Sequence, residues 1–110
     1  MPVVKIEYDK HKVEEGLLSE LIKHLNVSVA KSIDRPLSDV AIYTFPYERT
    51  VNGATIEVYV EIGSKSVKGS KEEMLAKITA DYGKFKTTHQ VQVDANLSVV
   101  EMNWCFNLSQ

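Results

Sequence analysis

The feature that most constrains the fold is an alternating segment followed by a helical one, an order that occurs twice along the chain. Residues 3–8 alternate between apolar and polar side chains, as in a strand with one covered face. Apolar residues then recur at helical spacing, at Leu17, Leu18, Leu21, Ile22, Leu25, Val29 and Ile33. Pro36 ends this predicted helix, because the residue before a proline is disfavoured in the α region. A second alternating segment follows over residues 39–45.

The second half of the chain repeats this order. Residues 56–62 alternate between aliphatic residues and glutamate or tyrosine. Ser70 and Glu73 have the spacing of a capping box, in which the serine side chain accepts a hydrogen bond from the backbone three residues on, so we expect the second helix to start here. Its apolar stripe consists of Met74, Leu75, Ile78, Tyr82 and Phe85. A fourth strand is predicted over residues 97–103.

Strand, helix and strand at these lengths favour a parallel pair of strands joined by a helical crossover in each half. The sequence therefore predicts an α+β fold, with two tandem β-α-β units that form a four-stranded sheet with two helices on one face. A chain of 110 residues with 44% hydrophobic residues fits one domain over 1–110. We expect the protein to form oligomers, because four valines supply more aliphatic surface than one layer of helices needs: Val4, Val58, Val60 and Val99.

Charge and composition exclude several classes of function. The net charge is −2 and both signs are spread along the chain, unlike the basic footprint of a nucleic-acid-binding protein. No apolar run is long enough to span a bilayer and no signal-peptide pattern opens the chain, so we expect a soluble, cytoplasmic protein. Cys105 is the only cysteine, which fits a reducing compartment. With no metal-ligand spacing and no glycine-rich phosphate loop, we expect neither a metal nor a cofactor.

Pro2 directly follows Met1 at the head of the first predicted strand. Methionine is ordinarily removed before so small a residue, and its removal would leave a free secondary amine. Surroundings that disfavour the ammonium form would let that amine act as a base near neutral pH. The simpler interpretation is a proline that begins a strand. A retained Met1 would make the prolyl nitrogen an amide, which cannot accept a proton.

The order of these motifs resembles that of the tautomerase superfamily, which includes 4-oxalocrotonate tautomerase and macrophage migration inhibitory factor and has an amino-terminal catalytic proline. Besides Pro2, three segments carry the resemblance. Residues 16–21 are similar to a helix start in the migration-inhibitory-factor branch, and residues 32–40 to the helix-to-strand crossing of the oxalocrotonate branch. Residues 61–65 resemble the Ile-Gly-x-Lys step after the third strand of the longer members. The similarity weakens after the first half and is poor over the last thirty residues.

This resemblance implies a homotrimer whose sheets face inward, and a Pro2 that removes a proton next to a carbonyl and returns it elsewhere. The implied substrate is a small-molecule carboxylate, either a 2-keto acid or a related unsaturated acid. Such a substrate needs a cation that holds its carboxylate and stabilises the developing enolate. By position, Arg35 and Lys12 are the candidate substrate-binding cations. Ile62 would lie beside Pro2 and supply an apolar wall or a backbone amide.

The chain also departs from the pattern of both branches. Ala41 stands where the oxalocrotonate branch has its second arginine, so that branch's substrate clamp is not reproduced. Ser98 and Val100 fall near the positions of the tyrosine and asparagine that close the pocket in the other branch. Trp104 or Phe106 is the alternative source of an aromatic wall. In such trimers a neighbouring subunit often completes the pocket.

Several candidates have a second interpretation. Arg35 could neutralise carbonyls at a helix end, and Lys12 could be a solvated loop lysine. Glu57 and Glu61 share one strand face, either as paired carboxylates for acid–base work or as a solvated edge or subunit contact. For the whole protein, one alternative is a non-catalytic oligomer that binds a small acid or a protein partner. The other is an enzyme that uses the same proline to activate water for dehalogenation or decarboxylation.

Overall fold

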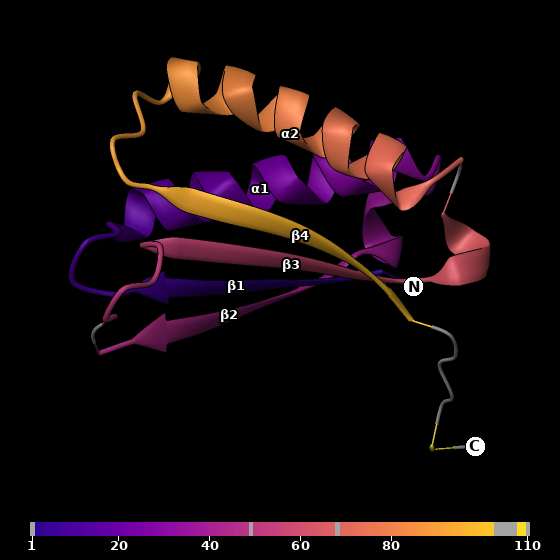
Figure 1. The fold of residues 1–110 in the computed structure, drawn as a ribbon, viewed down its shortest axis with the longest axis horizontal. Helices are drawn as coiled ribbons and strands as arrows, with labels where there is room; N and C mark the ends of the chain where they lie inside the picture. The colour runs from indigo at the N-terminus through magenta and orange to yellow at the C-terminus, as the bar shows by residue number, and fades with distance from the viewer. Residues whose placement is uncertain (1, 49, 68, 103–107, 110) are drawn as a thin grey trace.

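The computed structural model describes residues 2–48, 50–67, 69–102 and 108–109, and it contains two strand–helix–strand units (Figure 1). The first unit consists of strand β1 (Val3–Asp9), helix α1 (Glu15–Ser32), the short 3-10 helix η1 (Leu37–Asp39) and strand β2 (Ala41–Tyr47). The second unit consists of strand β3 (Ile56–Gly63), the short 3-10 helix η2 (Ser64–Ser66), helix α2 (Lys71–Thr88) and strand β4 (Ala95–Met102).

The four strands form one mixed sheet in the order β2-β1-β3-β4. β1 and β2 are parallel, as are β3 and β4, because each helix carries the chain back to the same end of the sheet. The two units join through antiparallel pairing of β1 with β3, with Val3 opposite Glu61. Both helices lie on the same face of the sheet (Figure 1). The predicted fold class is therefore confirmed.

Strand β2 lies two residues further along the chain than predicted. It continues through Pro46 and Tyr47, which lie beyond the predicted segment 39–45. β2 is an edge strand, where a proline without an N–H costs no hydrogen bond to a neighbour. The backbone carbonyl of Tyr47 still accepts a hydrogen bond from the N–H of Lys10, at 3.1 Å. Of the residues that we expected to begin this strand, Asp39 ends η1 and Val40 follows it with an extended backbone.

The core lies between the sheet and the helices. Val4 and Ile6 of β1 are completely buried there, and Leu21 of α1 and Ile78 of α2 pack in the same cluster. The four valines on which we based oligomerisation also belong to this side: Val4, Val58, Val60 and Val99. That argument was wrong, because the helices already cover these side chains. Neither helix in the described part of the chain is long and apolar enough to cross a membrane.

The uncovered apolar surface lies instead on the open face of the sheet. Val4 pairs with Ile42, and Ile42 packs against the core, so the next cross-strand pair, Lys5 and Tyr43, points to the opposite face. On that face the side chains of Tyr43 and Phe45 are 54% and 44% exposed. The open face therefore carries the aromatic residues that a partner subunit could cover.

Both helices end in a backbone motif that uses a left-handed residue. After α1, Asp34 has φ of 55°, and the N–H of Arg35 donates to the carbonyl of Ala30 at 3.0 Å. After α2, Gln90 has φ of 51°, and the N–H of Val91 donates to the carbonyl of Lys86 at 3.0 Å. This is the pattern of a Schellman motif, which glycine usually completes. At its start α2 has the predicted cap, since the Ser70 side chain accepts from the Glu73 N–H at 3.1 Å.

Replacing Gln90 with glycine should stabilise the protein, because glycine adopts positive φ without a steric penalty. We expect the free energy of unfolding to rise by about 0.5–1 kcal/mol, measured by urea denaturation. Thr88→Gly is the matched control. Thr88 lies in the last turn of α2, where glycine should lower stability by up to about 1 kcal/mol. Destabilisation by both variants would contradict the assigned C-terminal motif.

Candidate active site

Pro2 is buried directly before the central strand β1. Its carbonyl accepts a hydrogen bond from the N–H of Ala41 at 3.1 Å, which ties Pro2 to the start of β2. The register of β1 with β3 places Val3 opposite Glu61, and one further step places Pro2 opposite Ile62. The side chain of Ile62 is completely buried. Extending the register by one residue thus places Pro2, directly before β1, next to Ile62 near the end of β3.

Ends of several strands and helices lie on the same side of the molecule as Pro2, and we call this side the Pro2 edge. It contains the starts of β1 and β2 and the ends of β3 and β4, because the two parallel pairs run in opposite directions. α1 ends and α2 begins on this side as well (Figure 1). Residues from both halves of the chain can therefore contribute to a site at this edge.

Arg35 lies at the Pro2 edge, in the connection between α1 and β2. Its guanidinium contacts one carboxylate oxygen of Asp39, at 2.7 Å from Nε and 2.6 Å from a terminal nitrogen. The side chain is 62% exposed, so water can reach this ion pair. The contact with the helix end comes from the Arg35 backbone N–H rather than from the guanidinium. Arg35 is thus a cation at the Pro2 edge that is already engaged with a carboxylate.

Lys12 lies at the opposite end of the sheet. It follows β1, and its N–H donates to the carbonyl of Asp9 at 3.0 Å in the turn after that strand. The seven residues of β1 separate this turn from Pro2 by about 20 Å, at the usual rise per residue. Within one chain, Lys12 therefore cannot reach the same small ligand as Pro2.

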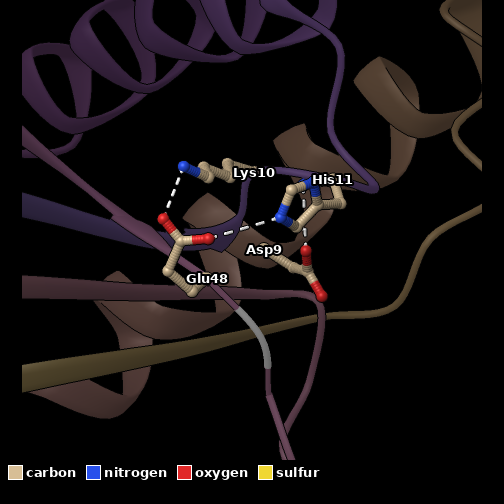
Figure 2. Close-up of polar contacts among 4 residues, drawn as sticks. All are labelled: Asp9, Lys10, His11 and Glu48. Carbon is tan, nitrogen blue, oxygen red and sulfur yellow. Dashed lines mark hydrogen bonds and ion pairs between the residues drawn. The ribbon is translucent and has the colours of Figure 1, made fainter.

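A cluster of polar contacts fixes the loop that carries Lys12 (Figure 2). The buried Asp9 side chain accepts a hydrogen bond from the N–H of His11 at 2.9 Å. Glu48, just after β2, pairs with Lys10 at 2.6 Å and lies 3.5 Å from Nε2 of His11. The hydrogen bond from Lys10 lowers the pKa of Glu48. This cluster attaches the loop to the end of β2, and sequence reasoning missed it because its partners are almost forty residues apart.

Glu57 and Glu61 have separate partners on the open face. The carboxylate of Glu61 pairs with Lys5 at 3.2 Å. Glu57 accepts a hydrogen bond from the side-chain amide of Asn96 at 3.1 Å. These contacts favour the interpretation of the two glutamates as surface or contact residues over that of a carboxylate pair for acid–base work.

A third glutamate on the open face, Glu7, contacts its aromatic residues. The hydroxyl of Tyr47 donates to Glu7 at 2.6 Å, and this hydrogen bond raises the pKa of Tyr47 to about 12. Burial, followed by the charges of Glu7 and Glu57, raises the pKa of Tyr59. Both phenols therefore keep their protons at neutral pH and remain hydrogen-bond donors.

Some predictions fall on residues that the structure does not describe. Met1, Trp104, Cys105 and Phe106 lie outside the described residues, so the state of the prolyl nitrogen and the aromatic wall stay predictions. Among the residues that are described, no group of three or more histidine, cysteine or acidic side chains is placed to hold a metal ion.

Solved structures with a similar fold show which known proteins share this architecture. No family model and no curated protein matches the sequence. A fused 4-OT symmetric trimer superposes with a TM-score of 0.65 over 91% of this chain and 85% of its own, at 16% identity. A macrophage migration inhibitory factor-like protein from Entamoeba histolytica gives 0.60 over 96% and 95%, at 15% identity. Malonate semialdehyde decarboxylase gives 0.66 over 98% and 92%, at 13% identity.

This chain has the tautomerase-superfamily fold. The resemblance first seen in Pro2 and its neighbouring segments is therefore confirmed at the level of the fold. Identities of 10–17% show the fold alone and do not confirm the reaction or the substrate of this protein. The chemistry of this tautomerase-fold protein must be argued from its own residues.

Proposed function

We propose that this protein is a small tautomerase that moves a proton between carbon and oxygen in a 2-keto acid or a related unsaturated acid. The observation that carries the proposal is the place of Pro2, a buried proline at the head of the central strand, opposite the apolar Ile62. Apolar surroundings disfavour an ammonium ion and so lower the pKa of an amine. Once Met1 is removed, the prolyl amine can serve as a base near neutral pH.

In the proposed reaction the prolyl amine takes a proton from the carbon next to the carbonyl and becomes an ammonium ion. The electrons of the broken C–H bond move to the carbonyl oxygen, which forms an enolate. The ammonium ion then returns the proton to the enolate oxygen. In the reverse direction the amine takes the proton from the enol O–H, and the ammonium ion returns it to the carbon. Arg35 is the proposed cation for the substrate carboxylate, which would have to displace Asp39 from the guanidinium.

Lys12 enters this proposal only through oligomerisation. Because about 20 Å of β1 separates it from Pro2 in one chain, a substrate-binding role requires Lys12 of the partner subunit. We therefore propose a homotrimer, supported by the fused 4-OT trimers of the same fold and by the exposed aromatic residues of the open face. Native mass spectrometry should find three chains of 12.4 kDa each. A monomer would exclude a role for Lys12.

The function is tested by adding the enol form of phenylpyruvate to protein whose intact mass shows that Met1 is absent. The ultraviolet absorbance of the enol should decay faster than in buffer alone. Protein that retains Met1 should not accelerate the decay, because its prolyl nitrogen is an amide. Unchanged decay with the free amine would exclude this tautomerase activity.

The ion pair of Arg35 with Asp39 favours a second candidate. With this cation engaged and Ala41 at the place of a second arginine, the protein could be a non-catalytic oligomer that binds a small acid or a protein partner. This candidate predicts an oligomer that retains Met1 and shows no turnover. The intact-mass measurement and the enol assay therefore separate the two functions.

A further inference from the structure

A polar groove lies between helices α1 and α2, and no strand residue lines it. It encloses a volume of about 380 Å³. Its walls carry lysine and histidine side chains from both sides: His24 and Lys31 from α1, Lys84 from α2, and His89 directly after α2. None of these residues has a role in the proposed tautomerase reaction.

The groove is lined by two lysines and one acidic residue, whereas the whole chain has a net charge of −2. Neither Lys31 nor Lys84 forms an ion pair with any residue that the structure describes. Asp81 also lines the groove, but its carboxylate accepts a hydrogen bond from the hydroxyl of the buried Ser28 at 2.8 Å. An adjoining hollow shares Ser28, Lys31 and Asp81 and adds Lys77. Lysines from both helices thus surround one carboxylate.

Ring packing holds the two histidines of the groove in place. The ring of Phe85 lies between them, with its centroid 4.8 Å from that of His24 and 4.4 Å from that of His89. Nε2 of His24 is buried and has no hydrogen-bond partner among the described residues. An unpaired buried acceptor is tolerated better than an unpaired N–H, which favours the neutral ring with its proton on Nδ1.

The protonation of His24 determines where the positive charge of the groove comes from. Burial lowers the pKa of His24, and the charge of His89 acts in the same direction, whereas Asp81 opposes both. Since the ordinary pKa of histidine is already below 7, His24 is neutral at that pH. The charge available to a ligand is therefore that of the lysines.

We propose that this groove binds a small oxyanion with more than one negative charge, a phosphate ester or a polycarboxylate, between Lys31 and Lys84. A multiply charged anion can contact ammonium groups from both helices at once, whereas chloride can satisfy only one of them. The volume is in the range of pockets for small molecules. The site is separate from Pro2 and does not depend on the proposed catalytic function.

The experiment is calorimetric titration of the full chain with inorganic pyrophosphate and, separately, with citrate. Sodium chloride at matched ionic strength is the reference. We expect one site per chain, and Lys31→Gln combined with Lys84→Gln should raise Kd about tenfold, the effect of two exposed ionic contacts. The control is Lys23→Gln combined with Lys86→Gln. It removes the same charge from the same two helices at positions outside the groove, and Kd should change by less than about twofold.

Any of three results would overturn the proposal. The two double variants could weaken binding equally, binding could be lost when sodium chloride is added to the same ionic strength, or neither pyrophosphate nor citrate could bind. Binding of pyrophosphate alone identifies a phosphate site, and binding of citrate alone identifies a polycarboxylate site. The Pro2→Ala variant should bind as tightly as the wild type, because Pro2 contributes nothing to the groove. Failure of the enol assay would therefore leave this inference standing.

Discussion

Replacing Pro2 with alanine is expected to lower kcat/KM for phenylpyruvate ketonisation by about 10²–10⁴-fold, the usual contribution of a positioned general base. The ring amine of proline is held at the head of β1 by its backbone bond to Ala41 and by its place opposite Ile62. An alanine amine at this position has additional rotational freedom and a different basicity. The ultraviolet decay of the enol, followed with Met1-free protein, measures the loss.

Pro46→Ala is the matched control for this experiment. It also removes a proline, but on the edge strand β2 and far from the start of β1. We expect its kcat/KM to stay within about twofold of the wild-type value and its circular dichroism to be unchanged. A Pro2→Ala enzyme that stays within a few-fold of the wild type would show that another group removes the proton.

The second large effect concerns stability. Ile78→Ala should lower the free energy of unfolding by about 2–5 kcal/mol, because it leaves a cavity in the core. The Ile78 side chain is completely buried where α2 packs on the sheet. Urea denaturation at a fixed protein concentration measures the change, so that any oligomer contributes equally to wild type and variant.

Lys86→Ala on the same helix is the control. Its side chain is exposed, so the free energy of unfolding should change by no more than about 0.5 kcal/mol. Equal losses in the two variants would mean that α2 does not pack through the face that contains Ile78. The two variants therefore test which face of α2 packs on the sheet, and how much the burial of Ile78 contributes to stability.

Much of the fold could be predicted because its signals are local. Alternation in residues 56–62 depends only on neighbouring side chains, and β3 begins and ends within one residue of that prediction. The Ser70 cap and the end of α1 before Pro36 also follow from residues close in sequence. β2 was less accurate, because a proline is tolerated in a strand only at a sheet edge, and strand order is not a local property.

The candidate site was predictable only in part. Pro2 and Ile62 were placed together through the family resemblance, and the register of β1 with β3 supports that placement. The partner of Arg35 was missed, although Asp39 is only four residues away, because the chain leaves the helix between them.

By itself, the sequence determined the elements, their order and the parallel pairing within each half, because apolar periodicity and chain connectivity are written along the chain. Only the tertiary structure decided which surfaces are covered and which charges meet. It buried Val58 and Val60 beneath the helices, paired Glu48 with Lys10 across almost forty residues, and brought Lys31 and Lys84 to the lining of one groove. These outcomes depend on how whole elements pack, since a side chain's neighbours across a sheet or a helix pair come from distant parts of the chain.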